Sequence, residues 1–331
     1  MKWVLAVFAV LLGACAAPPA VVAPESAGST GAVLARDERR LIVLPGPQDS
    51  LAVIARRFLG DPARAWEIAE FNGVSEASPG QALVVPLVAV NPRGVGAELQ
   101  LVPVLTYHRL GYKASRMTVT PEAFEAQLAY LQKNGYRVAR LADLAEFLQG
   151  RRALPRKTVV ITFDDGHGSA WQYAYPLLRK YGVPATFFLY TDILGGGDAL
   201  RWEQIREMSR SGLADFQLHS KSHANLVLRL PGESDKDYRS RLDGEIRSPR
   251  DVLTRQLGAA PAYYAYPFGD ANALVVERLQ AAGQSLGLTV NPGGNAFYAY
   301  PFMLRRTMIF GEYDLKAFDA ALQTTRSLGG K

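Results

Sequence analysis

Strands and helices alternate along the chain from Leu99 onward, and this alternation limits the possible folds more than any other feature of the sequence. Runs rich in β-branched and aromatic residues predict strands at 100–107, 158–163, 185–190, 215–218, 262–266, 286–290 and 306–310. Amphipathic stretches predict helices at 121–134, 170–181, 202–211, 236–256 and 271–282. The pattern therefore predicts an α/β domain with a parallel sheet, and its length of about 230 residues favours a distorted β/α barrel.

Polar side chains follow the ends of several of these strands. In chain order they are Tyr107 and His108, Asp164 and Asp165, His219 and His223, and Tyr266-Pro267-Phe268. The carboxyl ends of parallel strands meet at one edge of a barrel, and active sites form there. The sequence therefore predicts a functional site at this edge.

The adjacent aspartates suggest a metal site, because two neighbouring carboxylates repel and one would normally take up a proton. One Asp with His219 and His223 would give a divalent cation three ligands and leave positions open for water and substrate. The i,i+4 spacing places both imidazoles on one side if the segment turns helically. Zinc suits these donors, although Co²⁺, Ni²⁺, Mn²⁺ or Fe²⁺ could also serve. The other aspartate could then stay ionised as a base, with Gly166 bending the chain so that both carboxylates reach one site.

The segment 100–310 resembles the polysaccharide deacetylases of carbohydrate esterase family 4. The runs that carry the resemblance are "TFDDG" at 162–166, "HSKSH" at 219–223 and, less completely, "AYPFG" at 265–269. The resemblance implies metal-assisted hydrolysis of an N-acetyl amide. It assigns Asp164 as the catalytic base and Asp165, His219 and His223 as metal ligands. It also assigns the Phe268 N–H, with Tyr266 and Pro267 beside it, to the oxyanion and the substrate.

Two departures from the family pattern concern catalysis. Many members carry a C-terminal histidine as general acid, and the matching region "LGLTVNPGGNAFY" has none. We predict His108 as the acid, because "LTYHRL" resembles the branch that deacetylates exopolysaccharides such as poly-β-1,6-N-acetylglucosamine; the alternative is a buried structural histidine. His167 is the weaker candidate and is expected to be exposed. Ala265 stands where the family often has an arginine that orients the base, so Arg305 or Arg306 either replaces it or is exposed at a strand end.

The first 39 residues predict a lipid anchor and a tether. Residues 1–15 combine Lys2, a short apolar stretch and "LGAC", which resembles a bacterial lipobox and implies lipidation of Cys15. The alternative is an ordinary signal peptide with a chance cysteine. Ala16 follows the cysteine, where lipoproteins retained in the inner membrane have an aspartate. We therefore expect the anchor to be in the outer membrane, facing the periplasm. Residues 16–39 are rich in Ala, Pro, Ser and Gly and predict a flexible tether.

Residues 40–90 predict a small β-α-α-β domain that precedes the large domain at 91–331. The small domain resembles a LysM domain on Asp49, Asn72, Gly80 and Gln81. Such domains bind glycans that contain N-acetylglucosamine.

Taken together, the sequence predicts a metal-dependent N-deacetylase that acts on an N-acetylglucosamine polymer, preferably an exopolysaccharide of the poly-β-1,6-linked kind. Peptidoglycan is the alternative substrate, and a non-catalytic glycan-anchored envelope protein is the alternative class. The net charge of +6 is modest, and no basic run predicts a nucleic-acid partner.

Overall fold

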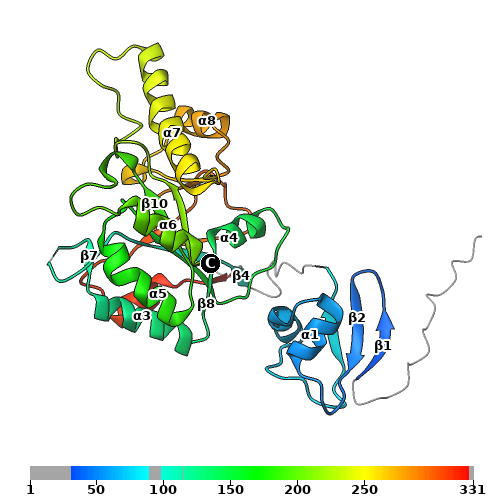
Figure 1. Cartoon of the computed structure of the whole chain (residues 1–331). Helices are drawn as coiled ribbons and strands as arrows, with labels where there is room; N and C mark the ends of the chain where they lie inside the picture. Colours follow the sequence, from blue (N-terminus) through cyan, green and yellow to red (C-terminus); the bar gives the residue numbers. More distant parts are fainter. Residues whose placement is uncertain (1–30, 89–97, 114, 328–331) are drawn as a thin grey trace, which may run out of the picture. The chain divides into compact units, whose positions relative to one another are not determined.

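The computed structural model describes residues 31–88, 98–113 and 115–327 (Figure 1). The chain divides into two compact units, Met1–Val88 and Ala89–Lys331. Cys15, the signal peptide and most of the predicted tether lie outside the described residues. Within the described part, no helix is long and apolar enough to cross a membrane.

The first unit is a three-stranded antiparallel sheet with two helices, in the order β1, β2, α1, α2, β3. Its elements are β1 (Ala32–Arg36), β2 (Arg40–Leu44), α1 (Leu51–Leu59), the 3₁₀ turn η1 (Pro62–Arg64), α2 (Ala65–Asn72) and β3 (Leu83–Pro86). The predicted β-α-α-β order is confirmed. The predicted tether is wrong at its end, because residues 32–36 pair with β2. A strand added to an existing edge needs no core of its own, so composition does not reveal it.

Two residues singled out in this unit have structural contacts. The Asn72 side chain donates to the carbonyls of Ile68 and Val84 and accepts from the Val84 N–H, each at 2.8 Å. Asp49 Oδ2 accepts from the N–H groups of Gly31 and Gly46 at 2.6 and 2.9 Å. Asn72 thus links α2 to β3, and Asp49 holds the chain before β1. Gly80 has φ 82° in the turn before β3, and Gln81 is exposed.

The second unit is built on a curled sheet in the order β13-β12-β11-β10-β9-β5-β14, with β8 also paired to β9 and β15 to β5. The sheet strands are β5 (Val102–Tyr107), β8 (Arg137–Ala139), β9 (Thr158–Phe163), β10 (Ala185–Leu189), β11 (Ala214–Leu218), β12 (Tyr263–Ala265), β13 (Leu286–Leu288), β14 (Gly294–Asn295) and β15 (Thr307–Met308). Two short pairs lie outside it: β4 (Glu98–Gln100) with β16 (Thr325–Ser327), and β6 (Arg109–Leu110) with β7 (Thr118–Val119). All pairings within the sheet are parallel except that of β14. The predicted parallel sheet is confirmed.

Helices cover the sheet (Figure 1). They are α3 (Pro121–Lys133), α4 (Leu141–Leu148), α5 (Tyr175–Tyr181), α6 (Trp202–Arg210), α7 (Asp235–Leu257), α8 (Ala273–Ala281) and α9 (Leu315–Ala321). The predicted helix at 170–181 begins as a π-helix, η2 (Ala170–Ala174), and two short 3₁₀ turns are η3 (Thr191–Ile193) and η4 (Pro267–Gly269). Sequence patterns did not predict α4, α9 or the short strands β6, β7, β8, β14 and β16.

The two ends of the sheet approach each other through the segment 304–308. The Thr289 N–H donates to the Leu304 carbonyl at 2.8 Å, beside the end of β13. Three residues later Thr307 and Met308 form β15, which pairs with Leu105 and Thr106 of β5. This segment therefore carries Arg306 into the curl between the first and last parallel strands.

Alternate residues of each strand belong to different cores, which positions the site. Leu105 of β5 and Ile161 of β9 pack toward the outer helices, whereas Val104 and Val160 belong to a second cluster that spans the curl and includes α4. Side chains of a strand alternate between its two faces, so Thr162 and then Asp164, at the strand end, lie on the same face as Val160. The interior of the curl thus changes from apolar to polar toward the carboxyl ends of the strands.

Candidate active site

A pocket of about 490 Å³ lies at the carboxyl ends of the parallel strands. Its lining residues are His108, Arg109, Met117, Asp164, Asp165, His167, His219, His223, Tyr266, Phe268, Val290 and Met308. The polar residues predicted from separate strand ends are therefore brought together. All four histidines of the chain lie here.

Asp164 is held by Arg306 in the interior of the curl. Arg306 NH1 and NH2 donate to the two carboxylate oxygens at 2.7 and 2.8 Å, and both side chains are almost fully buried, at 0% and 2% exposure. Nε of Arg306 donates to the Thr289 carbonyl at 2.9 Å. Burial would raise the pKa of Asp164, but the Arg306 guanidinium together with the charges of His219 and His108 outweighs it and holds that pKa below its usual value. Arg306 therefore takes the place that Ala265 leaves open, and the alternative of an exposed Arg306 is wrong. Arg305 is the exposed neighbour and donates to the Pro292 carbonyl.

Asp165 turns away from Asp164 because its own backbone is left-handed. Its φ is 74° and that of Gly166 is 85°, so the bend starts one residue before the predicted glycine. Oδ2 of Asp165 lies 3.1 Å from His167 Nε2, and Oδ1 lies 3.5 Å from His219 Nε2 and 3.3 Å from His223 Nε2. Burial would raise the pKa of Asp165, but the imidazoles of His167, His219 and His223 outweigh it and lower that pKa far below its usual value.

The segment that carries the two histidines is a loop and not the helical turn that the i,i+4 spacing predicts. Ser220 has φ 72° and His223 φ 61°, and the His223 N–H donates to Ser220 Oγ at 2.8 Å. The imidazoles still converge, with ring centroids 4.9 Å apart. The left-handed backbone at Ser220 and His223 thus brings the two imidazoles together without a helical turn.

Glu245 of α7 holds this loop from beneath. Its Oε2 accepts from the N–H groups of Lys221 and Ser222 at 3.0 Å, and its Oε1 accepts from Ser222 Oγ at 2.7 Å. The side chain is largely buried. Glu245 was not among the predicted site residues, although the sequence carries a signal for it: Glu245 shares a helix face with the buried Tyr238, Leu242 and Leu253.

The geometry fits a divalent cation. One ligand atom each from Asp165, His219 and His223 lie within 4.8 Å of one another. Oδ1 of Asp165 is buried and has no hydrogen-bond partner among the described atoms, so it is available as a ligand. Nδ1 of His219 lies 2.8 Å from the Ala265 carbonyl and donates to it, which leaves the Nε2 lone pair for the cation.

His167 is buried, at 8% exposure, and the expectation that it is exposed is wrong. Its Nε2 contacts the oxygen of Asp165 that faces away from His219 and His223. The backbone of His167 forms an antiparallel bridge with Ala199, which draws the residue inward.

His108 follows β5 and lines the pocket, as predicted. Burial lowers its pKa, partly opposed by the negative charges of Asp164 and Asp165. His108 thus lines the same pocket as Asp164 and Asp165.

The "AYPFG" segment places its three predicted residues differently. Phe268 is exposed by 59%, has φ 63°, and its ring lies edge-on to His223 with centroids 4.8 Å apart. Tyr266 forms part of the wall, but its hydroxyl donates to the Phe302 carbonyl at 2.8 Å. Pro267 is buried and does not line the pocket. Gly269 has φ 81°, and a Cβ there would collide with Val290, so only glycine allows the loop to close on the pocket.

Left-handed backbone is concentrated in this site. Among the described non-glycine residues, positive φ occurs at Asp165, Ser220, His223 and Phe268. Such conformations cost on the order of 1–3 kcal/mol each and persist where the surrounding structure enforces them, commonly at functional sites. Their grouping supports a functional role for this pocket.

Comparisons with known proteins agree with this geometry. Residues 151–287 match the family model for polysaccharide deacetylase. The chain is 27% identical over 211 residues to the poly-β-1,6-N-acetyl-D-glucosamine N-deacetylase of Escherichia coli, covering 54% of this chain and 31% of that protein. It is 27% identical over 193 residues to the enzyme of the same name from Staphylococcus aureus, covering 55% of this chain and 66% of that protein. The chain thus spans less than two thirds of either relative.

A solved structure shares the fold of the large unit. The structure of IcaB from Ammonifex degensii aligns with a TM-score of 0.61 and 29% identity, over 68% of this chain and 99% of that one. The match extends the similarity beyond the segment that the family model covers.

Proposed function

We propose that this chain, whose large unit carries a polysaccharide deacetylase domain and has N-deacetylase hydrolase activity, removes N-acetyl groups from a polymer of N-acetylglucosamine. The observation that carries the proposal is the separate positioning of two adjacent carboxylates. Asp164 is paired with a buried arginine, and Asp165 faces two imidazoles. Metal-assisted amide hydrolysis can use one carboxylate as base and the other as metal ligand, and the two carboxylates here are positioned for those separate roles.

In this proposal Asp165, His219 and His223 hold a divalent cation, which we propose is zinc. When bound, the cation polarises the amide carbonyl and makes water more acidic.

The residues of the chain then divide the proton transfers. Asp164 accepts a proton from the attacking water, and Arg306 keeps its carboxylate ionised and in one orientation. His108, which follows the neighbouring strand β5 at the same edge of the sheet, gives a proton to the leaving amine. The Phe268 N–H donates to the oxyanion that develops on the amide. Proton transfer by a positioned group typically contributes about 10²–10⁴-fold to the rate.

The relatives support a β-1,6-linked exopolysaccharide as the substrate, since two of them are named poly-β-1,6-N-acetyl-D-glucosamine N-deacetylases. The first unit remains proposed as a LysM-like glycan-binding domain. Because Asp49 and Asn72 are engaged within that unit, glycan contacts would have to come from other side chains, such as exposed Gln81. A lipid anchor at Cys15 and location at the outer membrane remain proposals from the sequence.

Acetate release tests the proposal. The full chain is incubated with added zinc on β-1,6-linked N-acetylglucosamine oligomers and, in parallel, on peptidoglycan. We expect release from the oligomers. Release from peptidoglycan alone would reassign the substrate, and release from neither by a zinc-loaded chain would favour a non-catalytic envelope protein.

A further inference from the structure

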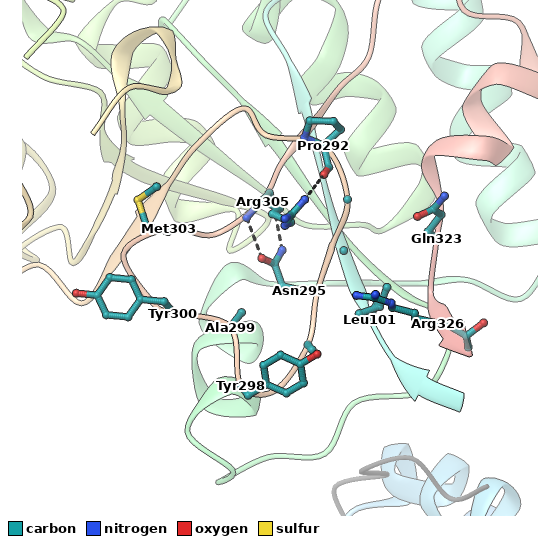
Figure 2. A pocket seen from close by; sticks show the side chains of 14 residues that line it. Leu101, Pro292, Asn295, Tyr298, Ala299, Tyr300, Met303, Arg305, Gln323 and Arg326 are labelled. Carbon is teal, nitrogen blue, oxygen red and sulfur yellow. Dashed lines mark hydrogen bonds between the residues drawn. The ribbon is translucent and has the colours of Figure 1, made fainter. Parts of the chain in front are cut away.

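A second pocket, which we call the distal pocket, lies at the opposite end of the sheet from the catalytic one (Figure 2). Its volume is about 690 Å³, within the range of about 300–1,000 Å³ usual for ligand sites. Gly294 and Asn295 line it and pair with Pro103 and Val102 at the start of β5, whereas the catalytic pocket lies beyond the end of that strand. The two pockets share no lining residue, so the distal pocket is a separate site.

The floor of the distal pocket is fixed by the backbone of segment 292–295. A Cβ on Gly294 would lie 2.6 Å from Leu101 Cβ, so the close approach of these two segments requires glycine. The Asn295 side chain accepts from the Arg305 N–H at 2.8 Å and donates to the Arg305 carbonyl at 3.0 Å. These contacts form the pocket before any ligand arrives, which lowers the cost of binding.

Three exposed side chains with large apolar surfaces line the distal pocket (Figure 2). They are Tyr298, Tyr300 and Met303, which are 64%, 54% and 41% exposed. Exposed apolar groups that gather at one place on a surface mark interaction sites. A tyrosine ring can pack on the C–H face of a pyranose while its hydroxyl group forms a hydrogen bond, so these rings suit a sugar.

The distal pocket is positively charged. Its described lining includes no aspartate or glutamate, but it includes Arg305 and Arg326. Arg305 NH1 donates to the Pro292 carbonyl at 3.0 Å, which holds that guanidinium in the wall. Arg326 is exposed, and its side chain makes no ion pair or hydrogen bond with the part of the chain that the structure describes. Arg109 at the catalytic pocket, by contrast, is paired with Asp198. One guanidinium of the distal pocket is therefore available to a ligand.

A free guanidinium favours a planar anion. Its N–H donors match the two oxygens of a carboxylate, and such charge-assisted hydrogen bonds are roughly twice as strong as neutral ones. The same charge repels an ammonium group. A polymer of N-acetylglucosamine is neutral and becomes cationic when it is deacetylated, so neither form matches this charge. A sugar with a carboxylate matches both the charge and the rings.

We infer that the distal pocket binds a sugar unit that carries a carboxylate, with Arg326 on the carboxylate and Tyr298 and Tyr300 on the pyranose. The inference goes beyond the proposed function and does not depend on it, because no catalytic residue takes part. It gives the large unit a second glycan ligand that differs in charge from the proposed substrate. Two sources share this chemistry: a chain of uronic acids, and a cell-wall glycan whose muramic acid carries a lactyl carboxylate.

Two matched pairs of sugars test the inference by calorimetric titration of the full chain. A glucuronic acid tetramer is compared with the glucose tetramer of the same linkage, and neither has an N-acetyl group for the catalytic pocket. N-acetylmuramic acid is compared with N-acetylglucosamine, which lacks the lactyl carboxylate. We expect the acidic member of at least one pair to bind about fivefold to tenfold more tightly than its neutral partner. Added salt should reduce this difference, and the pair that shows it identifies the source.

Three variants assign the binding to the distal pocket. Arg326→Gln should remove the preference for the acidic sugar, because it keeps a hydrogen-bonding side chain and loses the charge. Tyr300→Ala should weaken binding of the acidic sugar about threefold to tenfold, because a ring contact is lost. Arg210→Gln is the matched control and should bind as wild type, since Arg210 is exposed in the last turn of α6 and lies outside the pocket.

Thermal melting of each variant shows whether it is folded. Arg326 and Tyr300 are both exposed, so we expect wild-type melting temperatures. The inference is overturned if the acidic and neutral members of both pairs bind equally, or if none of the four sugars binds outside the catalytic pocket. It is also overturned if folded Arg326→Gln keeps the preference for the acidic sugar, or if Arg210→Gln loses as much affinity as Arg326→Gln.

Discussion

Asp164 and Asp165 are adjacent in the sequence, but their carboxylates have different partners. Asp164 lies on the face of β9 that is directed into the curl, and its carboxylate accepts hydrogen bonds from Arg306. Asp165 adopts a left-handed backbone and meets the histidines. The pKa of each carboxylate is lowered, because the nearby arginine and imidazole groups outweigh the effect of burial. The proposed division of roles, Asp164 as base and Asp165 as metal ligand, depends on this backbone turn.

Arg306 should be a positioning residue for Asp164. We predict that Arg306→Lys lowers kcat about 10- to 100-fold, because an ammonium cannot donate a bidentate pair and the base loses its orientation. Zinc affinity should not change. Arg305→Lys is the matched control, since Arg305 is exposed and bonds only to the Pro292 carbonyl and the Asn295 side chain among its described partners. Equal losses in both variants would show that the effect is not specific to Asp164.

His108 should act as the general acid. Replacement by Gln removes the transferable proton and keeps a similar volume, so we predict a fall in kcat of about 10²–10⁴-fold. Zinc binding and KM should be close to wild type. Acetate release under saturating substrate measures this effect. Retention of kcat within a few-fold would return His108 to the alternative of a structural histidine.

His167 should orient the metal-binding carboxylate. Its Nε2 contacts Oδ2 of Asp165 and leaves Oδ1 facing His219 and His223. We predict that His167→Phe weakens zinc binding about 10- to 100-fold, as loss of an outer-shell partner usually does. His167→Asn, which keeps an N–H donor, should recover part of the affinity. Competition with a chelator measures both; unchanged affinity in the Phe variant would refute the role.

At the scale of elements, the loop 219–223, which carries two of the proposed metal ligands, depends on α7. Loop 219–223 has little regular structure of its own, and Glu245 accepts three hydrogen bonds from it. The helix therefore supplies the support that a helical turn within the motif would otherwise have given.

Glu245→Ala should weaken zinc binding about tenfold, because the loop loses its support. It should also lower the free energy of unfolding by about 1–3 kcal/mol, since the partly buried Lys221 and Ser222 donors lose a charged acceptor. Asp251→Ala, at an exposed position of the same helix, is the control and should change neither quantity. Chemical denaturation and zinc titration measure the two effects. Identical behaviour of the two variants would contradict this assignment.

Sequence patterns predicted the long elements well because their signals are local. β9 matches its predicted bounds, since "TVVITF" is a continuous β-branched and aromatic run. β14 is only Gly294-Asn295, and its pairing depends on Asn295 bonds to the Val102 and Arg305 carbonyls. β1 pairs with the edge of β2, and composition alone does not predict this pairing. No sequence signal that we recognise accounts for the π-helix at the start of the 170–181 segment.

The site was predictable where its residues lie within motifs and unpredictable where they come from distant elements. His108, Asp164, Asp165, His219 and His223 all reach one pocket, as their places at strand ends predicted. The sequence could not show which of Arg305 and Arg306 contacts Asp164. The direction of each side chain depends on how segment 304–308 crosses the curl. The bend begins at Asp165, whose backbone is left-handed. Sequence rules expect this conformation at glycine first, so they place the bend at Gly166.

At the scale of the whole molecule, the described catalytic residues all belong to the second unit, from His108 to Arg306. The first unit has a separate core built on Leu41, Val43, Ile54, Ile68 and Val85. We propose that the first unit contributes by holding the enzyme in place or by selecting the glycan.

In the proposed mechanism the two adjacent aspartates have separate roles, and zinc binding to Asp164→Asn and Asp165→Asn tests this separation most directly. Equilibrium titration should show one zinc per chain in wild type and in Asp164→Asn, although Asp164→Asn should release no acetate. Asp165→Asn should bind zinc at least about 10-fold more weakly, because it loses a charged ligand. Equal zinc affinity in the two variants, or wild-type acetate release by Asp164→Asn, would contradict the account.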